Sequence, residues 1–375
     1  MSSFNLLQLV PSLNSGGVER GTIDLANYLS EQKIKNHIIS NGGELLKELD
    51  SNTFHKKLPV HTKNFLKYLS LSKSIDNYIK SNKINILHVR SRAPSWIVRF
   101  LNKKNLKTVG SYHNVYGGNS FIKKLYNKNL SNMDYVLAIS NYVKDSIVKK
   151  YNINPHKVKV ISRGIDTNFF REPISEIKKQ NLIKNLKINT NNKIILYPGR
   201  ITNWKGQLKF VQNLKKNKKP DFCIYFVGSD ENTGHAYELK KLIAQAGLSE
   251  ICKLVGSLDK ENLKIMYSIS NLVLSAPLRP EGFGRVISES IFLKIPILAF
   301  NYGGAKEQLD GISPLYSCNP LDYNELSKKI NKILIYSNEK LSSIKDEAFE
   351  KINTNYTKDI MVKNYKNFYD EISSK

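Results

Sequence analysis

The chain has 375 residues, of which 41% are hydrophobic, and a formal net charge of +26 at pH 7. This length exceeds the size at which one core usually keeps growing, so we expect two domains, and the apolar and aromatic content excludes a disordered chain. The charge favours a polyanionic partner, which leaves nucleic acid, anionic lipid headgroups, phosphorylated substrates and sugar nucleotides open, beside simple compositional drift.

Short apolar runs bounded by turn residues alternate with segments of helical period along the first half of the chain. The first run lacks a basic flank and a small-residue cleavage site, so we expect no secretion signal and a cytoplasmic protein. The alternation is typical of parallel strands joined by crossover helices, an α/β fold. The strands expected here cover residues 4–10, 37–40, 86–89, 107–112, 135–139 and 158–161.

A polar, Lys-rich stretch at residues 163–192 separates this half from a second one. The strand rhythm then restarts, which predicts a second doubly wound domain. A last amphipathic segment, with Tyr365 and Phe368 at helical spacing, is expected to pack back on the first domain. The expected domains cover residues 1–168, 169–354 and 355–375, and the strands of the second cover 193–197, 222–227, 251–255, 272–275 and 295–300.

The cysteines and the hydropathy pattern exclude two further classes of protein. Cys223, Cys252 and Cys318 stand far apart, so they predict neither a disulfide framework nor a zinc knuckle and suit a reducing compartment. Nowhere do about 18 apolar residues follow one another, as a membrane-spanning helix requires. Any membrane contact is therefore expected to be peripheral, on the inner face of the plasma membrane.

A Gly-Gly turn follows the first expected strand and opens a helix. Gly16 and Gly17 would let a substrate approach the backbone, where free N–H groups at a helix start attract anionic groups. The dinucleotide pattern G-x-G-x-x-G and the P-loop pattern are both absent, which disfavours dehydrogenases and NTPases. A purely structural turn is an equally good interpretation of these two glycines taken alone.

His113 follows the expected strand at residues 107–112 and precedes a Gly-rich segment. This places an imidazole at the carboxyl end of a strand, where doubly wound sheets bind their ligands. A buried structural histidine is the alternative.

Two cations follow the first strand of the second half. Arg200 comes three residues after its end, and Lys205 lies at the next expected helix entry. A guanidinium fork and an ammonium at one strand edge suit a diphosphate. The alternative is that both are solvated cations of a very basic protein.

The segment at residues 279–289 is the most informative of the chain. Gly282 and Gly284 open a helix whose backbone N–H groups could hold phosphate, while Glu281 precedes that helix and Glu289 lies inside it. Carboxylates on both sides of an anion site suit a nucleotide sugar, because they accept hydrogen bonds from sugar and ribose hydroxyls. Taken alone, both acids could equally be ordinary helix charges.

The combination of these motifs resembles glycosyltransferase family 4. The resemblance rests on Gly16-Gly17, Arg200 with Lys205, and Glu281 followed eight residues later by Glu289, and it covers nearly the whole chain. Residues 138–141 and 160–170 are similar to two further segments of that family. The resemblance implies the GT-B fold, in which two Rossmann-like domains face each other across a cleft.

The resemblance also implies roles for the individual residues. Arg200 and Lys205 would bind the donor diphosphate and offset the charge of the leaving group, as metals do elsewhere. Glu281 would contact the transferred sugar and Glu289 the ribose, while His113 would lie beside the anomeric carbon. The backbone from Phe283 through Gly284 and Arg285 to Val286, after Gly282, would contact the phosphates, and Gly16 and Gly17 the donor phosphate or the acceptor.

The family's chemistry implies retention at the anomeric carbon and no cofactor. No D-x-D sequence occurs, which agrees with transfer without a metal. The leaving phosphate itself can accept the proton of the acceptor, so no classical base is expected. The donor would be a nucleoside-diphosphate sugar carrying a hexose.

A thinner resemblance concerns the acceptor. Residues 88–96 and the Arg279 to Gly284 version of the donor motif look like family members that assemble bacterial lipopolysaccharide or surface polysaccharide. A glycan or a lipid-linked acceptor is therefore expected, and an anionic membrane surface would explain the charge. Candidate basic patches are Lys56-Lys57, Arg90 to Arg99, Lys103-Lys104 and Lys123-Lys124.

Two alternative functions remain open from the sequence. A nucleotide-sugar epimerase or a phosphorylase could use the same scaffold, because a fold does not specify its reaction. A nucleic-acid-binding protein would fit the charge, but the basic residues are scattered and no zinc finger, RRM or KH signature appears, so no nucleic-acid partner is expected.

Overall fold

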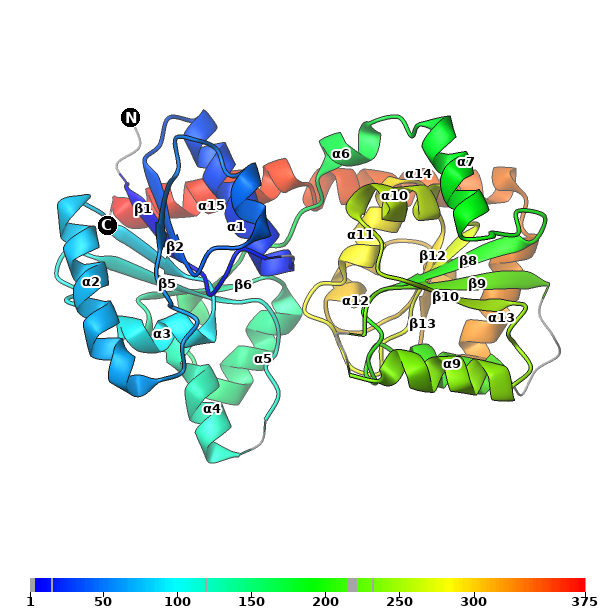
Figure 1. The fold of residues 1–375 in the computed structure, drawn as a ribbon, viewed down its shortest axis with the longest axis horizontal. Helices are drawn as coiled ribbons and strands as arrows, with labels where there is room; N and C mark the ends of the chain where they lie inside the picture. Colours follow the sequence, from blue (N-terminus) through cyan, green and yellow to red (C-terminus); the bar gives the residue numbers. More distant parts are fainter. Residues whose placement is uncertain (1–3, 15, 119, 215–220, 231–232, 375) are drawn as a thin grey trace. The chain divides into compact units, whose positions relative to one another are not determined.

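The computed structural model describes residues 4–14, 16–118, 120–214, 221–230 and 233–374. The chain folds as two compact units: unit 1 comprises Met1–Gly164 with Lys358–Lys375, and unit 2 comprises Ile165–Thr357. Each unit has one parallel sheet flanked by helices (Figure 1). Both are doubly wound Rossmann-like domains, which confirms the α/β class expected from the sequence.

Unit 1 contains a seven-stranded sheet in the order β3-β2-β1-β4-β5-β6-β7. Its strands are β1 (Leu6–Leu9), β2 (Asn36–Ser40), β3 (Phe54–Lys57), β4 (Ile86–Val89), β5 (Lys107–Tyr112), β6 (Tyr135–Ala138) and β7 (Val158–Val160). Its α-helices are α1 (Gly17–Glu31), α2 (Tyr68–Ser81), α3 (Arg92–Val98), α4 (Phe121–Lys128), α5 (Asn141–Tyr151) and α15 (Lys358–Ser373). Short 3₁₀ helices are η1 (Glu44–Glu48), η2 (Phe65–Lys67), η3 (Asn129–Asn132) and η4 (Pro155–Lys157).

The central strands of unit 1 are buried because helices cover the sheet on both faces. Every residue of β1, β2 and β4 is buried, as is usual for parallel strands of this kind. β1 pairs with both β2 and β4, so the strand order reverses between β1 and β4. Ligands of doubly wound sheets bind at the carboxyl side of such a switch point.

The last helix of the chain, α15, packs on unit 1. Its apolar face joins α1 and the sheet in one core, with Met361, Tyr365 and Phe368 all buried. The hydroxyl of Tyr369 lies 2.7 Å from Nδ1 of the buried His88 on β4. The helix is therefore tied to unit 1 by both packing and a buried hydrogen bond.

Unit 2 contains a six-stranded sheet in the order β10-β9-β8-β11-β12-β13. Its strands are β8 (Lys193–Pro198), β9 (Phe222–Val227), β10 (Cys252–Gly256), β11 (Leu272–Ser275), β12 (Ile297–Phe300) and β13 (Ser317–Cys318). Its helices are α6 (Thr167–Arg171), α7 (Glu176–Asn185), α8 (Gln207–Leu214), α9 (His235–Gln245), α10 (Lys260–Ser268), α11 (Arg285–Phe292), α12 (Gly304–Leu309), η5 (Pro314–Tyr316), α13 (Tyr323–Ile335) and α14 (Asn338–Asn355). The switch point of this sheet lies between β8 and β11.

Two strands were not expected from the sequence, and both lie at sheet edges. β3 reads Phe-His-Lys-Lys, with Phe54 54% exposed, so it presents no apolar run. β13 has only two residues and pairs with β12 through Ser317 and Cys318. Edge strands are covered less completely than central ones, so their sequences carry a weaker strand signal.

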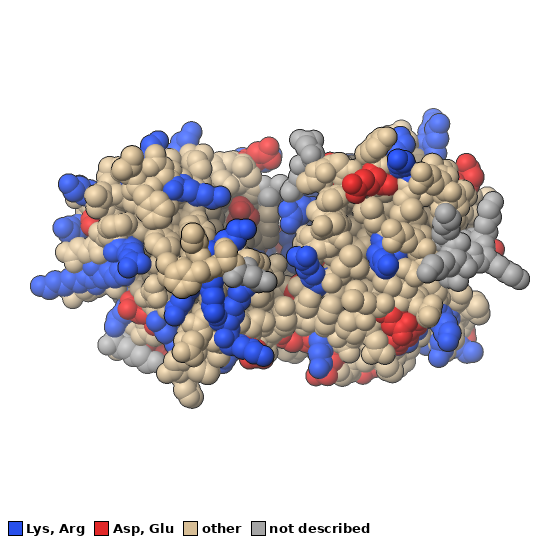
Figure 2. All heavy atoms as spheres, turned by 90° about the horizontal axis from the view of Figure 1, so that it is seen from below, with Lys and Arg blue, Asp and Glu red and all other residues tan. Residues whose placement is uncertain are grey.

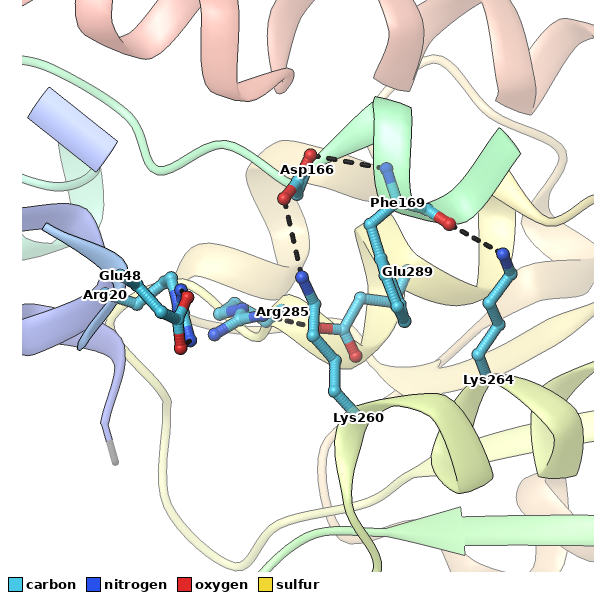
Figure 3. A network of polar contacts seen from close by, with 8 residues as sticks. All are labelled: Arg20, Glu48, Asp166, Phe169, Lys260, Lys264, Arg285 and Glu289. Carbon is cyan, nitrogen blue, oxygen red and sulfur yellow. Dashed lines mark hydrogen bonds and ion pairs between the residues drawn. The ribbon is translucent and has the colours of Figure 1, made fainter. Parts of the chain in front are cut away.

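The unit boundary differs from the expected one after residue 168, which falls inside α6. Unit 2 begins at Ile165, which is fully buried in its core and bridges Thr357. Nζ of Lys264, on α10, donates to the carbonyl oxygen of Phe169 at 2.6 Å (Figure 3). It also donates to the carbonyl oxygen of Glu172 at 2.5 Å. These bonds use backbone carbonyls, so the polar composition of the segment did not reveal that it belongs to unit 2.

Candidate functional site

The carboxyl ends of β8, β11 and β12 meet at one edge of the unit 2 sheet. β11 is hydrogen-bonded to both β8 and β12, and all three strands are parallel, so the segments that follow them are neighbours. Arg200 and Lys205 follow β8, while Glu281 and Glu289 follow β11. The edge therefore gathers the residues that the sequence assigned to this half of the chain.

Lys205 and Glu281 form an ion pair, although they are 76 residues apart. Nζ of Lys205 lies 2.6 Å from Oε1 of Glu281, and the two side chains are only 17% and 15% exposed. The ammonium also lies 5.0 Å from the centre of the Trp204 ring. A partly buried charge needs a partner, so each of these residues holds the other in a defined position.

The loop after β8 is fixed by close backbone contacts. Gly206 has φ +89°, and a Cβ there would lie 2.0 Å from the carbonyl oxygen of Ala276, so only glycine fits. The Tyr197 hydroxyl donates to the Lys205 carbonyl at 2.8 Å. Nε2 of Gln207 donates to the Arg200 carbonyl at 3.1 Å, and the Arg200 side chain is exposed. Arg200 and Lys205 thus extend from a rigid loop.

Helix α11 begins at Arg285, next to this loop. Its N-cap residue, Gly284, has φ +87° and provides no side-chain cap. A helix leaves its first N–H groups without intrahelical partners, so this end can hold an anion. Phe283 is buried, with its ring centre 5.6 Å from that of Tyr356, and it anchors the turn. Gly282, Phe283, Gly284, Arg285 and Val286 therefore form one ordered turn into the helix.

Glu289 lies one turn further into α11 and is 7% exposed. Its Oε1 accepts a hydrogen bond from Nη2 of Arg285 at 2.8 Å (Figure 3). Its Oε2 accepts one from the Tyr267 hydroxyl at 2.9 Å. Burial, together with the Glu289 charge, raises the pKa of Tyr267 well above its ordinary value, so the phenol stays protonated and donates. Each carboxylate oxygen keeps capacity for a further hydrogen bond.

His113 lies directly after β5 in unit 1. Nη2 of Arg163 lies 3.0 Å from its Nδ1, and a guanidinium can only donate, so Nδ1 is the acceptor. Burial, and then the charges of Arg163 and Arg90, lowers the pKa of His113 well below 6.5, so the ring is neutral near pH 7. The proton therefore resides on Nε2, which is buried and faces the backbone of Arg90, a contact that favours the protonated ring. His113 offers one N–H donor.

Two buried arginines surround the start of α1. Arg90 is 1% exposed and donates to Oε1 of Gln8 at 2.8 Å, and Arg163 donates to the carbonyl of Gly17. A Cβ at Gly21 would lie 3.2 Å from Nη1 of Arg163, so the absence of a side chain lets the guanidinium approach the helix. Because Arg90 is buried, the expected surface patch from Arg90 to Arg99 is wrong at its first residue.

Gly16 and Gly17 stand at the N-terminus of α1, which has no side-chain cap. Gly16 is the N-cap residue, and Arg163 connects Gly17 to His113. Burial raises the pKa of Glu19 in the first turn, partly offset by the nearby Arg163 and Arg90 charges. The structure thus brings Gly17 and His113, 96 residues apart in the sequence, to one arginine.

Some residues of these sites escaped the sequence reasoning. Gly303 and Gly304 follow β12 and approach the turn before α11 so closely that a Cβ on Gly304 would lie 2.5 Å from the Gly282 carbonyl oxygen. A Gly-Gly pair after a strand is the same signal that identified Gly16 and Gly17. Arg90 directly follows β4, as His113 directly follows β5, so the strand-end criterion that singled out His113 would also have singled out Arg90.

Within the described ranges, no three His, Cys, Asp or Glu side chains are grouped as a metal ion would need. The helices in the same ranges include none with the length and apolarity needed to cross a bilayer. The three cysteines are buried and free, and burial raises the pKa of Cys252 and Cys318 to about 12.

Two family models match the chain. The model described as Glycosyltransferase Family 4 matches residues 15–169, and the one described as Glycosyl transferases group 1 matches residues 178–351. The crystal structure of a glycosyltransferase from Rickettsia africae is 33% identical, with a TM-score of 0.88 over 98% of each chain.

Curated relatives match shorter parts of the chain. A phosphatidylinositol N-acetylglucosaminyltransferase subunit of Saccharomyces cerevisiae is 22% identical over 69% of this chain. The matched part covers 57% of the length of the yeast protein. A lipopolysaccharide 1,2-N-acetylglucosaminetransferase of Salmonella typhimurium is 26% identical over 45% of this chain and 46% of that protein. Both names describe transfer of a sugar.

Proposed function

The chain belongs to the family 4, group 1 glycosyltransferases, and on that premise we propose that it transfers a hexose-type sugar from a nucleoside-diphosphate sugar, with retention and without a metal. The acceptor is a glycan or a lipid-linked glycan, in lipopolysaccharide or surface-polysaccharide assembly. The protein acts in the cytoplasm, on the inner face of the plasma membrane. Family membership favours transfer over the epimerase, phosphorylase and nucleic-acid-binding alternatives.

One observation carries the proposal: the Lys205–Glu281 pair lies on the same sheet edge as the uncapped start of α11. A diphosphate bound there accepts hydrogen bonds from the N–H groups of the helix, and it competes with Glu281 for the ammonium of Lys205. When phosphate engages the ammonium, the Glu281 carboxylate becomes available to accept hydrogen bonds from sugar hydroxyls. The pair thus keeps both groups positioned before the donor arrives.

The remaining residues supply binding and charge compensation. Arg200, exposed on the same loop as Lys205, adds a second cation for the leaving diphosphate. Glu289 accepts hydrogen bonds from the ribose hydroxyls with the oxygen capacity that Arg285 and Tyr267 leave. By the family resemblance we assign His113 to the sugar, near the anomeric carbon, and Gly16 and Gly17 to the donor phosphate or the acceptor.

The names of two relatives support the acceptor class. The Salmonella protein is named for lipopolysaccharide and the yeast protein for phosphatidylinositol, so both names describe glycans or lipids as acceptors. We propose the same class for this chain.

A thermal-shift titration tests the donor site first. The protein is measured against UDP, GDP, ADP and CMP and their common sugar conjugates, with and without EDTA. A ligand at a hundred times its Kd stabilises the fold by about 2.7 kcal/mol. A shift for one nucleoside diphosphate that EDTA does not alter supports a metal-free donor site, whereas a shift that requires a metal contradicts it.

Transfer itself is tested with the donor so identified. Nucleoside diphosphate should appear only when an acceptor is added, and NMR of the product should show the anomeric configuration of the donor. Inversion at the anomeric carbon would overturn the retaining assignment, and sugar isomerisation without acceptor would indicate an epimerase.

A further inference from the structure

Unit 1 exposes large apolar side chains in two neighbouring segments. In the segment of η2 and the start of α2, Phe65 and Leu69 are both 59% exposed and Leu66 is 89% exposed. In α4, Phe121 is 79%, Ile122 78% and Leu125 49% exposed. Isolated exposed apolar side chains are common on proteins, but contiguous groups mark interaction surfaces. We call these six residues the apolar face.

Aromatic contacts join the two segments into one surface. The Phe65 ring centre lies 5.7 Å from that of Trp96 on α3, and the Trp96 ring stacks on Tyr126 of α4 at 5.8 Å. Ile122 precedes Tyr126 by four residues, so both lie on the same side of α4. Nε1 of Trp96 donates to the Tyr126 carbonyl at 3.3 Å, which fixes α3 against α4. Trp96 and Tyr126 therefore connect the two segments of the apolar face, which both lie on unit 1.

Positive charge surrounds the apolar face. Residues 51–133 contain 16 Lys and Arg residues, and their only acidic residue is Asp76. On the same segments and on the loop after α3, the basic side chains are exposed: Lys63, Lys67, Arg99, Lys103, Lys123 and Lys124. Seen from the side on which α4 lies, the surface of unit 1 carries many Lys and Arg side chains and few acidic ones (Figure 2).

We propose that the apolar face docks on an anionic lipid bilayer, with α4 lying in the plane of the membrane interface. Its Phe, Ile and Leu side chains enter the acyl boundary, while the lysines beside them contact anionic headgroups. Each Lys or Arg near such a surface strengthens binding roughly fivefold. Docking on lipid stands by itself; its purpose, to bring a lipid-linked acceptor to the enzyme, rests on the proposed function.

The charge decides between a bilayer and the other occupants. A second copy of the chain, docked by the same face, would bring two basic surfaces together, which is repulsive. Nucleic acid would satisfy the lysines and could stack on the rings, but it has no acyl phase for Leu66, Ile122 and Leu125 to enter. An anionic bilayer satisfies both the charge and the aliphatic side chains.

Vesicle flotation of the full-length protein tests the proposal. Wild-type protein should float with vesicles of phosphatidylcholine and phosphatidylglycerol and much less with phosphatidylcholine alone. Phe121→Ser with Ile122→Ser should weaken binding about tenfold, and Lys123→Glu with Lys124→Glu at least tenfold. The matched controls lie on unit 2, where Ile177→Ser with Ile335→Ser, and Lys240→Glu with Lys241→Glu, change equally exposed residues. Equal binding by test and control variants would overturn the proposal.

A fluorescence measurement tests the same surface without changing it. The chain has two tryptophans, so Trp204→Phe leaves Trp96 as the single reporter. Brominated lipid should quench Trp96 in mixed anionic vesicles, and no quenching despite flotation would place the contact elsewhere. Dimers that dissociate in the Phe121→Ser, Ile122→Ser variant would show instead that copies of the chain meet here. DNA binding that this variant weakens as much as vesicle binding would also overturn the lipid assignment.

The outcome is separable from that of the proposed function. Sugar transfer to a water-soluble acceptor, assayed without vesicles, should be unchanged in the α4 variants. Loss of flotation with intact transfer confirms the docking surface, whereas flotation by a protein that transfers no sugar overturns only the proposed function.

Discussion

The two units have similar sheet topologies, but the charged side chains at the carboxyl ends of their strands have different partners. In unit 2 the cations are matched by acids, as Lys205 is by Glu281 and Arg285 by Glu289. In unit 1 the buried Arg90 and Arg163 donate to Gln8, the Gly17 carbonyl and His113, and the charges of both arginines also act on the Glu19 carboxyl. An edge with ion pairs can exchange a pair for the charge of a ligand, while at the other edge the Arg163 guanidinium holds a neutral histidine in position. The same fold therefore offers two different binding chemistries.

The largest effect is expected for Glu281→Gln in unit 2. The amide keeps the size of the side chain but loses the charge that holds Lys205, so turnover should fall by about 100-fold, with a modest change in nucleotide affinity. Steady-state kinetics would measure both. Glu250→Gln, at a side chain that is 95% exposed, is the control. Unchanged turnover would show that the pair has no part in transfer.

Lys205→Ala should weaken nucleoside-diphosphate binding by about 30-fold, because a charge-assisted contact contributes about 2 kcal/mol. Isothermal titration calorimetry checks this. Lys209→Ala on α8 removes an exposed lysine from the next helix and should leave affinity unchanged. Equal losses in the two variants would reduce the role of Lys205 to general surface charge.

Gly303→Ala tests how strongly the unit 2 edge depends on close backbone approach. Gly303 has φ +61°, and a Cβ there would lie 2.6 Å from the Glu281 carbonyl oxygen. Gly311 has φ +69° but open space around it, so Gly311→Ala carries the backbone strain without the clash. We expect Gly303→Ala to lower the free energy of unfolding by roughly 1 to 2 kcal/mol more than Gly311→Ala, measured in urea.

Acid should destabilise unit 1 more than unit 2. Burial, and to a lesser degree Lys35, lowers the pKa of His37 from 6.5 to about 4, and the pKa values of His55, His88 and His113 in the same unit are also lowered. The unfolded chain therefore binds more protons between about pH 6.5 and 4. As the pH is lowered from 6.5 to 4, the free energy of unfolding should therefore decrease, by up to about 1.4 kcal/mol per pH unit for each histidine.

The histidine effect is checked with one variant and one control. His37→Gln should reduce the slope of unfolding free energy against pH, measured by chemical denaturation between pH 4 and 7. His61→Gln, at an exposed position, should leave that slope as in the wild type. A slope that His37→Gln leaves unchanged would assign the acid sensitivity to other groups.

The sequence predicted the central strands well because burial on both faces leaves a continuous apolar run. β4, β5, β9 and β11 have the bounds expected from the sequence. It missed β3 and β13, where an edge position relaxes that requirement. It also placed the domain boundary inside α6, because the contacts of Ile165 and Lys264 with distant segments leave no mark in local composition.

The candidate site was predicted residue by residue but not pair by pair. Strand-end position and residue chemistry singled out Lys205 and Glu281 on the unit 2 sheet and His113 on the unit 1 sheet, since the parallel strands of one sheet bring their carboxyl ends to one edge. The ion pair between Lys205 and Glu281, and the tautomer that Arg163 imposes on His113, depend on distances between segments far apart in the chain. No local pattern encodes those distances.

The sequence by itself determined the α/β class, the two-domain organisation, the family and the excess of positive charge, because periodicity, motif order and composition are local or additive properties. Only the tertiary structure decided which charges pair, which arginines are buried, and that Phe65 and Ile122 belong to one exposed face. The physical reason is that burial and pairing are properties of the packed chain, in which neighbours in space are rarely neighbours in sequence.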